Sequence, residues 1–202
     1  EAINPVEILF QYIPYYGRGD QSCDGIVRAT LGNLLIDDVD IVDENGNTLL
    51  LLACQYRSED LVRILMRKGA NANAVNGAGA CGLHFSCYDE SSSYVISKAL
   101  LSNGAQPEIC ESTYGCTPLH YAGATGDVEM CKLLLSYGSI VDTKDYYEYT
   151  CVDYAREAGM SAAESYLQDK LNDSVERKAK FAEHSPVAQY NRSFSFGSPI
   201  PS

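Results

Sequence analysis

The stretch GCTPLHYAGATGDVEMCKLLLSYG, residues 115–138, decides the fold of this chain. It begins with the turn residue Gly115, and Thr117 then precedes Pro118, the usual order of a capping residue and a first helical residue. A second run of apolar residues follows at helical spacing. It closes with Gly138, a residue that can adopt the left-handed conformation ending a helix. The stretch therefore predicts a turn, a short helix and a second helix.

The same pattern recurs along the chain at a nearly constant period. Equivalent starts lie 33 residues apart at Asp43 and Asn76, and again 33 residues apart at Ser112 and Asp145. The spacing from Asn76 to Ser112 is 36 residues, and we place the excess in two loops, at residues 89–93 and before Tyr114. Such a period is typical of repeat proteins, in which each unit buries its apolar face only against its neighbours.

The stretch at residues 115–138 resembles the ankyrin repeat family almost throughout its helix-turn-helix pattern. The resemblance covers about residues 43–171 and implies an all-α fold, a solenoid of stacked helix-turn-helix units with hairpin loops. The last unit carries Asp153 where the family usually has histidine, which favours a terminal cap. We predict four repeat units, at residues 43–75, 76–111, 112–144 and 145–171.

The two ends of the chain differ from the repeats. Residues 1–42 hold two apolar patches and are predicted to form N-terminal capping helices or a divergent repeat. Residues 172–202 lack sustained periodicity and are rich in serine, proline and charge, so we predict a flexible polar tail there. Because the first residue is Glu1 rather than methionine, we expect the chain to be part of a longer protein.

Charge and cysteine usage limit the classes of partner. The chain carries 27 acidic and 15 basic residues, a formal charge of −12, which repels the phosphates of nucleic acid and anionic membranes. No apolar run approaches the roughly 20 residues that a membrane-spanning helix needs. Cys54, Cys87 and Cys131 fall in apolar helical stretches rather than in a disulfide framework. We therefore expect a cytoplasmic monomer with no nucleic-acid or membrane partner.

Motifs that suggest chemistry each have a structural interpretation that we prefer. GAGACG, residues 77–82, matches the dinucleotide fingerprint, but no strand precedes it. Cys81, His84 and Cys87 have spacing suited to zinc. Yet His84 and His120 share one repeat position, where the resemblance implies a structural, hydrogen-bonding histidine. The acidic run before the first unit fails the calcium-loop spacing, and the cysteines fall on the scaffold. We predict no metal, no cofactor and no catalytic residue, hence no enzyme.

Tyrosines gather where the resemblance places the concave binding surface, at hairpin tips and at the ends of first helices. Tyrosine is favoured at interface hot spots. The tip tyrosines lack the periodic apolar spacing that Tyr121 and Tyr154 share with core residues. Tyr114 and Tyr147 hold the same place in successive hairpins, so we expect them to lie near one another. The predicted partner-binding residues are Tyr56, Tyr88, Asp89, Tyr114, Tyr146, Tyr147, Tyr149 and Glu157.

The sequence thus predicts a non-catalytic protein–protein interaction module, an adaptor or scaffold that binds a protein on its hairpin tips and concave helix face. The acidic Asp89 and Glu157 would flank the tyrosines, so a basic and partly apolar partner segment is expected. The alternative is a regulatory or targeting ankyrin segment of a larger signalling enzyme whose catalytic domain lies outside this chain. A purely structural spacer would have no preferred ligand face.

The C-terminal region also holds candidate phosphorylation sites. Ser185 and Ser198 precede prolines, and Arg192 lies three residues before Ser195, the spacing of sites for basic-directed kinases. The sequence predicts regulation by phosphorylation at these serines.

Overall fold

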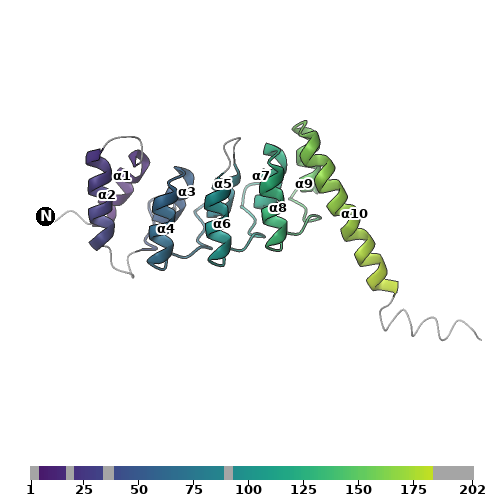
Figure 1. Cartoon of the computed structure of the whole chain (residues 1–202), viewed down its shortest axis with the longest axis horizontal. Coiled ribbons are helices and arrows are strands. Elements are labelled where there is room, and N and C mark those ends of the chain that lie inside the picture. Colours follow the sequence, from purple (N-terminus) through teal and green to yellow (C-terminus); the bar gives the residue numbers. More distant parts are fainter. Residues whose placement is uncertain (1–4, 17–20, 34–38, 89–92, 184–202) are drawn as a thin grey trace, which may run out of the picture.

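The computed structural model describes residues 5–16, 21–33, 39–88 and 93–183. Within these residues every regular element is a helix, and the helices follow one another as a single row of pairs (Figure 1). The all-α solenoid expected from the sequence is therefore confirmed.

Four helix pairs make up the repeats. In each pair a short first helix begins at a capping position, and a second helix returns alongside it. The pairs are α3 (Leu49–Gln55) with α4 (Glu59–Arg67), α5 (Gly82–Cys87) with α6 (Tyr94–Ser102), α7 (Pro118–Thr125) with α8 (Val128–Ser136), and α9 (Cys151–Glu157) with α10 (Ser161–Glu183).

The N-terminal side of the row is helical as well. Helix α1 (Pro5–Tyr12), the 3₁₀ turn η1 (Ile13–Tyr15) and α2 (Gln21–Asn33) lie in the region predicted to hold capping helices or a divergent repeat. Leu9 and Ile13 are fully buried, and η1 contacts α3 of the first repeat. These side chains cover the apolar face that the first repeat would otherwise expose.

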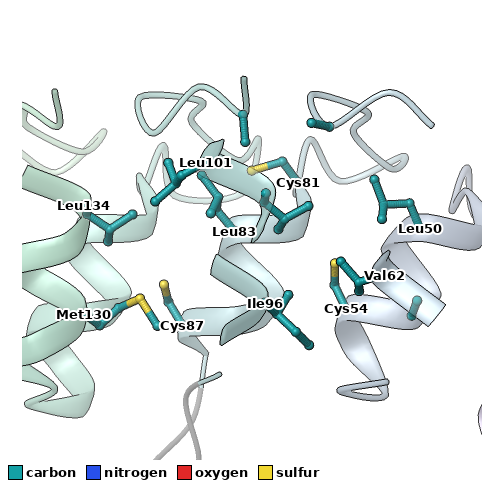
Figure 2. Packing of buried hydrophobic residues seen from close by; sticks show 14 of the residues in the cluster. Leu50, Cys54, Val62, Cys81, Leu83, Cys87, Ile96, Leu101, Met130 and Leu134 are labelled. Carbon is teal, nitrogen blue, oxygen red and sulfur yellow. The ribbon is translucent and has the colours of Figure 1, made fainter. Parts of the chain in front are cut away.

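The core is one continuous layer between neighbouring pairs. First helices contact first helices, from α3 to α9, and second helices contact second helices, from α4 to α10 (Figure 1). Figure 2 shows Cys54, Cys87 and Met130 among the buried side chains of this layer. Burial raises the pKa of the Cys87 thiol to about 12, so the thiol stays protonated. Buried cysteine here acts as a small apolar side chain.

The hairpins stack on one another through backbone hydrogen bonds. The amides of Gly77, Ser112 and Tyr146 donate to the carbonyl oxygens of Asn45, Ala78 and Tyr114 in the preceding hairpin, at 2.8–2.9 Å. This ladder joins every hairpin to the next, from the first repeat to the fourth. It makes the row of tips a rigid edge of the solenoid.

The third hairpin is one residue longer than the fourth. Its base amide, that of Glu111, bonds to the carbonyl oxygen of Cys116, whereas in the fourth hairpin Asp145 bonds to Tyr149. Glu111, not Ser112, therefore occupies the place of Asp145 at the hairpin base. Counted back from the capping residue Thr117, the predicted start at residue 112 matches the start of the fourth unit at Asp145. Counted from the hairpin base, the third unit starts one residue earlier, at Glu111. The longer glutamate side chain spans the extra residue of this hairpin.

The C-terminal boundary also differs from the prediction. Helix α10 continues to Glu183, so the flexible tail predicted from residue 172 begins inside a helix. Among the side chains that the structure describes, Leu167 is the last that is fully buried, and most of those beyond it are exposed. Ion pairs between residues one helical turn apart, such as Lys170 with Asp173 at 3.6 Å, occur in this exposed part of the helix. Of the helices described, none is long and apolar enough to cross a membrane.

Candidate partner-binding surface

A single acidic side chain holds each of the last two hairpins in shape. Oδ1 of Asp145 accepts hydrogen bonds from the amides of Tyr147 and Tyr149, at 2.8 and 2.9 Å. Glu111 does the same for Thr113 at 2.6 Å and Tyr114 at 2.8 Å. The backbones that carry the tip tyrosines are thus fixed before any partner arrives. Binding through preformed loops loses less conformational entropy.

Both acidic side chains carry a negative charge beneath the tips. Burial opposes ionisation of Asp145, but the hydrogen bonds from Tyr154, Tyr149 and Tyr147 outweigh it and lower the carboxyl pKa. Burial likewise opposes ionisation of Glu111, and its backbone hydrogen bonds lower the pKa below the usual range. At neutral pH these carboxylates are ionised, and their field adds to the negative charge of the surface.

Four tyrosines converge on one hollow between the third and fourth units. The rings of Tyr114 and Tyr147 lie 6.4 Å apart with a 43° tilt, and those of Tyr149 and Tyr154 lie 6.4 Å apart, edge to face. Exposed fractions of 50% for Tyr114, 66% for Tyr147 and 46% for Tyr149 show rings that face solvent. We call this the tyrosine hollow, a space of about 320 Å³ lined by Tyr114, Asp145, Tyr147, Tyr149, Tyr154 and Glu157.

Tyr154 is a residue of the candidate site that the sequence did not predict. Its periodic position in α9 indicated a core residue, but the side chain is only half-buried and forms a wall of the hollow. Its hydroxyl donates to Oδ2 of Asp145 at 2.8 Å, and its ring packs edge-on against His120 at 5.3 Å. The available signal was its place one helical turn before Glu157, on the same face of the helix.

Tyr146, which was predicted to extend the tyrosine patch, does not line the hollow. Its ring covers Gly115, where an added Cβ would come within 2.6 Å of the ring carbons. Yet Tyr146 is as exposed as Tyr147, at 67% against 66%. The two neighbouring residues therefore form a matched pair, one beside the hollow and one lining it.

The other predicted tyrosines lie along the first helices. Tyr88 ends α5, is 70% exposed, and its ring lies 5.8 Å from the ring of Tyr121 in the next unit. Tyr56 ends α3, where it is half-buried and packs against the core, away from the hollow. The predicted Asp89 lies outside the described residues. So do the candidate phosphorylation sites Ser185, Ser195 and Ser198.

The repeat histidines connect one unit to the next. Nδ1 of His120 accepts the amide hydrogen of Thr117 at 3.1 Å and lies 2.9 Å from the Thr117 hydroxyl. Because that nitrogen accepts, the proton sits on Nε2, which donates to the carbonyl oxygen of Tyr149 at 3.2 Å. His120 thereby supports the hairpin that carries Tyr149.

His84 repeats this arrangement one unit earlier. Its Nδ1 accepts from the amide of Cys81 at 3.1 Å, and its Nε2 lies 3.0 Å from the carbonyl oxygen of Cys116. In the last unit Asp153 takes the histidine position and accepts from the Thr150 amide at 2.9 Å. A carboxylate has no hydrogen to donate onward, which suits a unit that helix α10, and not a further hairpin, follows within the described residues.

Stacked helix pairs joined by a ladder of hairpin hydrogen bonds define a repeat protein of the solenoid class. A family model described as ankyrin repeats (3 copies) matches residues 22–109 and 83–178. The chain belongs to the ankyrin repeat family. Ankyrin repeats are in general protein–protein interaction modules, and the family is typically non-catalytic.

Relatives of several kinds share these repeats. An ankyrin repeat protein of fowlpox virus (strain NVSL) is 32% identical over 126 residues, 62% of this chain and 28% of the viral protein. The tyrosine-protein kinase Shark of Drosophila melanogaster is 28% identical over 129 residues, 63% of this chain and 13% of the kinase. Cyclin-dependent kinase inhibitor 2A of Monodelphis domestica is 28% identical over 130 residues, 64% of this chain and 74% of the inhibitor.

Proposed function

We propose that this chain is an adaptor or scaffold module that binds a protein partner at the tyrosine hollow and the adjoining concave helix face. One observation carries the proposal: four tyrosines from two repeats line a single hollow, and three of their rings face solvent. Exposed aromatic rings that converge on one hollow are the usual anchors of protein interfaces. The pair Tyr88 and Tyr121 continues the aromatic surface toward the second unit.

The chemistry of the surface selects a basic and partly apolar partner segment. Tyrosine rings bury apolar groups, and their hydroxyls keep polar contacts at the edge. Glu157 lines the hollow and is exposed, while the ionised Asp145 lies behind the tips. The formal charge of −12 extends the negative field beyond the hollow. Such a field speeds the approach of a cationic segment.

We further propose that the module works as a cytoplasmic monomer without catalysis, metal or cofactor, on partners other than nucleic acid or membranes. The repeat histidines that resemble zinc ligands use both ring nitrogens in hydrogen bonds. Light scattering checks the monomeric state. Helical circular dichroism should stay unchanged on chelation, and stoichiometric zinc in the purified chain would contradict this part of the proposal.

A second candidate function is a regulatory or targeting segment within a larger signalling enzyme. The observation in its favour is the match to the kinase Shark, of which the chain spans 13%. The two functions share the binding surface and differ in what the rest of the polypeptide does. Sequencing the complete transcript distinguishes them, because a catalytic domain in the same polypeptide would support the second.

Photocrosslinking tests the proposed surface. A photoreactive phenylalanine analogue replaces Tyr147 in the hollow, or Ile140, which is 52% exposed but lies outside it. The proposal predicts that one polypeptide from the native cell crosslinks at position 147 and not at position 140. Equal crosslinking at both positions, or none at 147, would contradict it.

A further inference from the structure

We infer that the tyrosine hollow receives the side chain of an arginine from the partner segment. This inference rests on the proposed function and makes it specific, since it names the group that the hollow recognises.

Four aromatic rings line one small space. Tyr114 and Tyr147 are tilted by 43°, and Tyr149 and Tyr154 by 84°, so their ring planes form differently oriented walls. A cation within about 6 Å of a ring centroid is attracted by the negative face of the ring. The planar guanidinium group also stacks on such faces, which a compact ammonium group does not.

The carboxylates supply the second half of the recognition. Glu157 at the end of α9 lines the hollow and is exposed, so its two oxygens are open to a ligand. A guanidinium group binds a carboxylate with two parallel hydrogen bonds while its face rests on a ring. Asp145 is only 5% exposed and is occupied by its own hairpin, so it acts through its charge alone.

The nearby cations of the chain are engaged elsewhere. Lys144 pairs with Glu148 at 2.7 Å, and Arg156 pairs with both Asp153 and Glu164 at 2.8 Å. None of these cations lines the hollow. Within the described residues the negative charge at the hollow is therefore left for a cation from another molecule.

Nuclear magnetic resonance of the intact chain tests the inference with acetyl-arginine amide as probe. Saturable shifts are expected at the amides of Tyr147, Tyr149 and Glu157. The matched probes are acetyl-citrulline amide, which has the same shape without the charge, and acetyl-lysine amide, which has the charge without the planar group. We expect both to bind more weakly by about tenfold or more. Citrulline lacks the charge, and lysine lacks the planar guanidinium group that forms two parallel hydrogen bonds with a carboxylate.

Variants locate the contact. Tyr147→Ala should abolish the shifts and Glu157→Gln should weaken arginine binding severalfold, whereas Tyr146→Ala should leave it unchanged. Equal binding of citrulline would show that the hollow accepts any polar chain, and equal binding of lysine would remove the case for arginine. Absence of shifts with all three probes would also overturn the inference. An Arg192→Ala chain that binds the probe more tightly would assign the hollow to the chain's own C-terminal region.

Failure here is distinguishable from failure of the proposed function. Crosslinking at position 147 reports whether a partner uses the hollow, whatever residue enters it. If a partner crosslinks at position 147 but the hollow does not prefer arginine, only the arginine inference is wrong. If the hollow prefers arginine but no partner crosslinks at position 147, the proposed function is wrong.

Discussion

The rings of Tyr114 and Tyr147 lie 6.4 Å apart because one hydrogen bond sets the register of the hairpins that carry them. The amide of Tyr146 donates to the carbonyl oxygen of Tyr114 at 2.8 Å, so the two hairpin tips are held in register. Asp145 then fixes the turn that presents Tyr147. A hollow built this way exists without a ligand, and its geometry depends on Asp145, whose side chain is almost fully buried.

Removing the histidine link should destabilise the stack. His120→Ala leaves the buried Thr117 amide without its acceptor and removes one of the two donors to the Tyr149 carbonyl, which keeps the amide of Asp145. We expect a loss of about 2 kcal/mol in the free energy of unfolding, the scale of buried polar groups left unpaired. Urea unfolding measures it. A loss below about 0.5 kcal/mol would mean that water replaces the imidazole.

Stability should fall as the pH drops below neutral, because two buried histidines are neutral in the folded chain. Burial lowers the pKa of His84 and His120 below the ordinary 6.5, so the unfolded chain takes up protons first. Their contribution is complete above pH 6.5 and is lost as the pH falls from there toward the lowered folded value. The slope should reach up to about 1.4 kcal/mol per pH unit for each histidine.

Urea unfolding between about pH 7.5 and pH 5.5 measures this slope. The chain with both His84→Asn and His120→Asn serves as the control and should show a flatter dependence. The hairpin carboxylates, whose pKa values are lowered from 3.8 and 4.5, act in a separate window at lower pH. An unchanged slope in the double variant would show that the histidines are not the groups that titrate.

Glu148→Gly should stabilise the fourth hairpin. Glu148 has a φ of +69°, in the left-handed region, at the turn position where the other hairpins have Gly46, Gly79 and Gly115. Glycine relieves strain of about 1–2 kcal/mol, and its extra freedom in the unfolded chain offsets part of that gain. The lost ion pair with Lys144 is exposed and contributes little.

We expect a net gain of about 0.5 kcal/mol, seen as a higher urea midpoint. The reverse change, Gly115→Ala, should lower the midpoint, because it adds strain at a φ of +77° and a clash with the Tyr146 ring. A lower midpoint for Glu148→Gly would show that the glutamate side chain stabilises the turn more than its backbone strains it.

Thr117→Val should cost on the order of 1 kcal/mol, because it removes a buried hydroxyl that caps α7 and contacts His120 at 2.9 Å. Coupling between neighbours should spread the loss to the adjacent units. Thermal melting detects it, and an unchanged melting temperature would show that the hydroxyl makes no net contribution.

Local sequence signals predicted the repeats well because each unit is built from them. Thr117 and Pro118 start a helix, Gly138 ends one, and the period brings Tyr114 beside Tyr147, as the structure confirms. Extra length before Tyr114 was expected, but spacing alone does not show that Glu111, and not Ser112, forms the base of the third hairpin.

Side-chain direction was the harder part of the candidate site. Tyr146 and Tyr147 are indistinguishable by composition and exposure, yet only the second lines the hollow. The periodic position of Tyr154 predicted a core residue, because it lies on the inner face of its helix. Periodicity does not show that part of this face is exposed to solvent. The end of α10 was placed too early, since a polar helix beyond the last core residue has no apolar periodicity to reveal it.

The most direct test of the account compares two neighbouring variants in binding to the partner identified by crosslinking. Tyr147→Ala should weaken binding by about tenfold or more, as truncation of an interface hot spot does, while Tyr146→Ala should change it less than about twofold. Both variants should melt close to the original chain, because both rings are largely exposed. Equal losses of affinity, or a larger loss for Tyr146→Ala, would contradict the claim that the tyrosine hollow is the binding site.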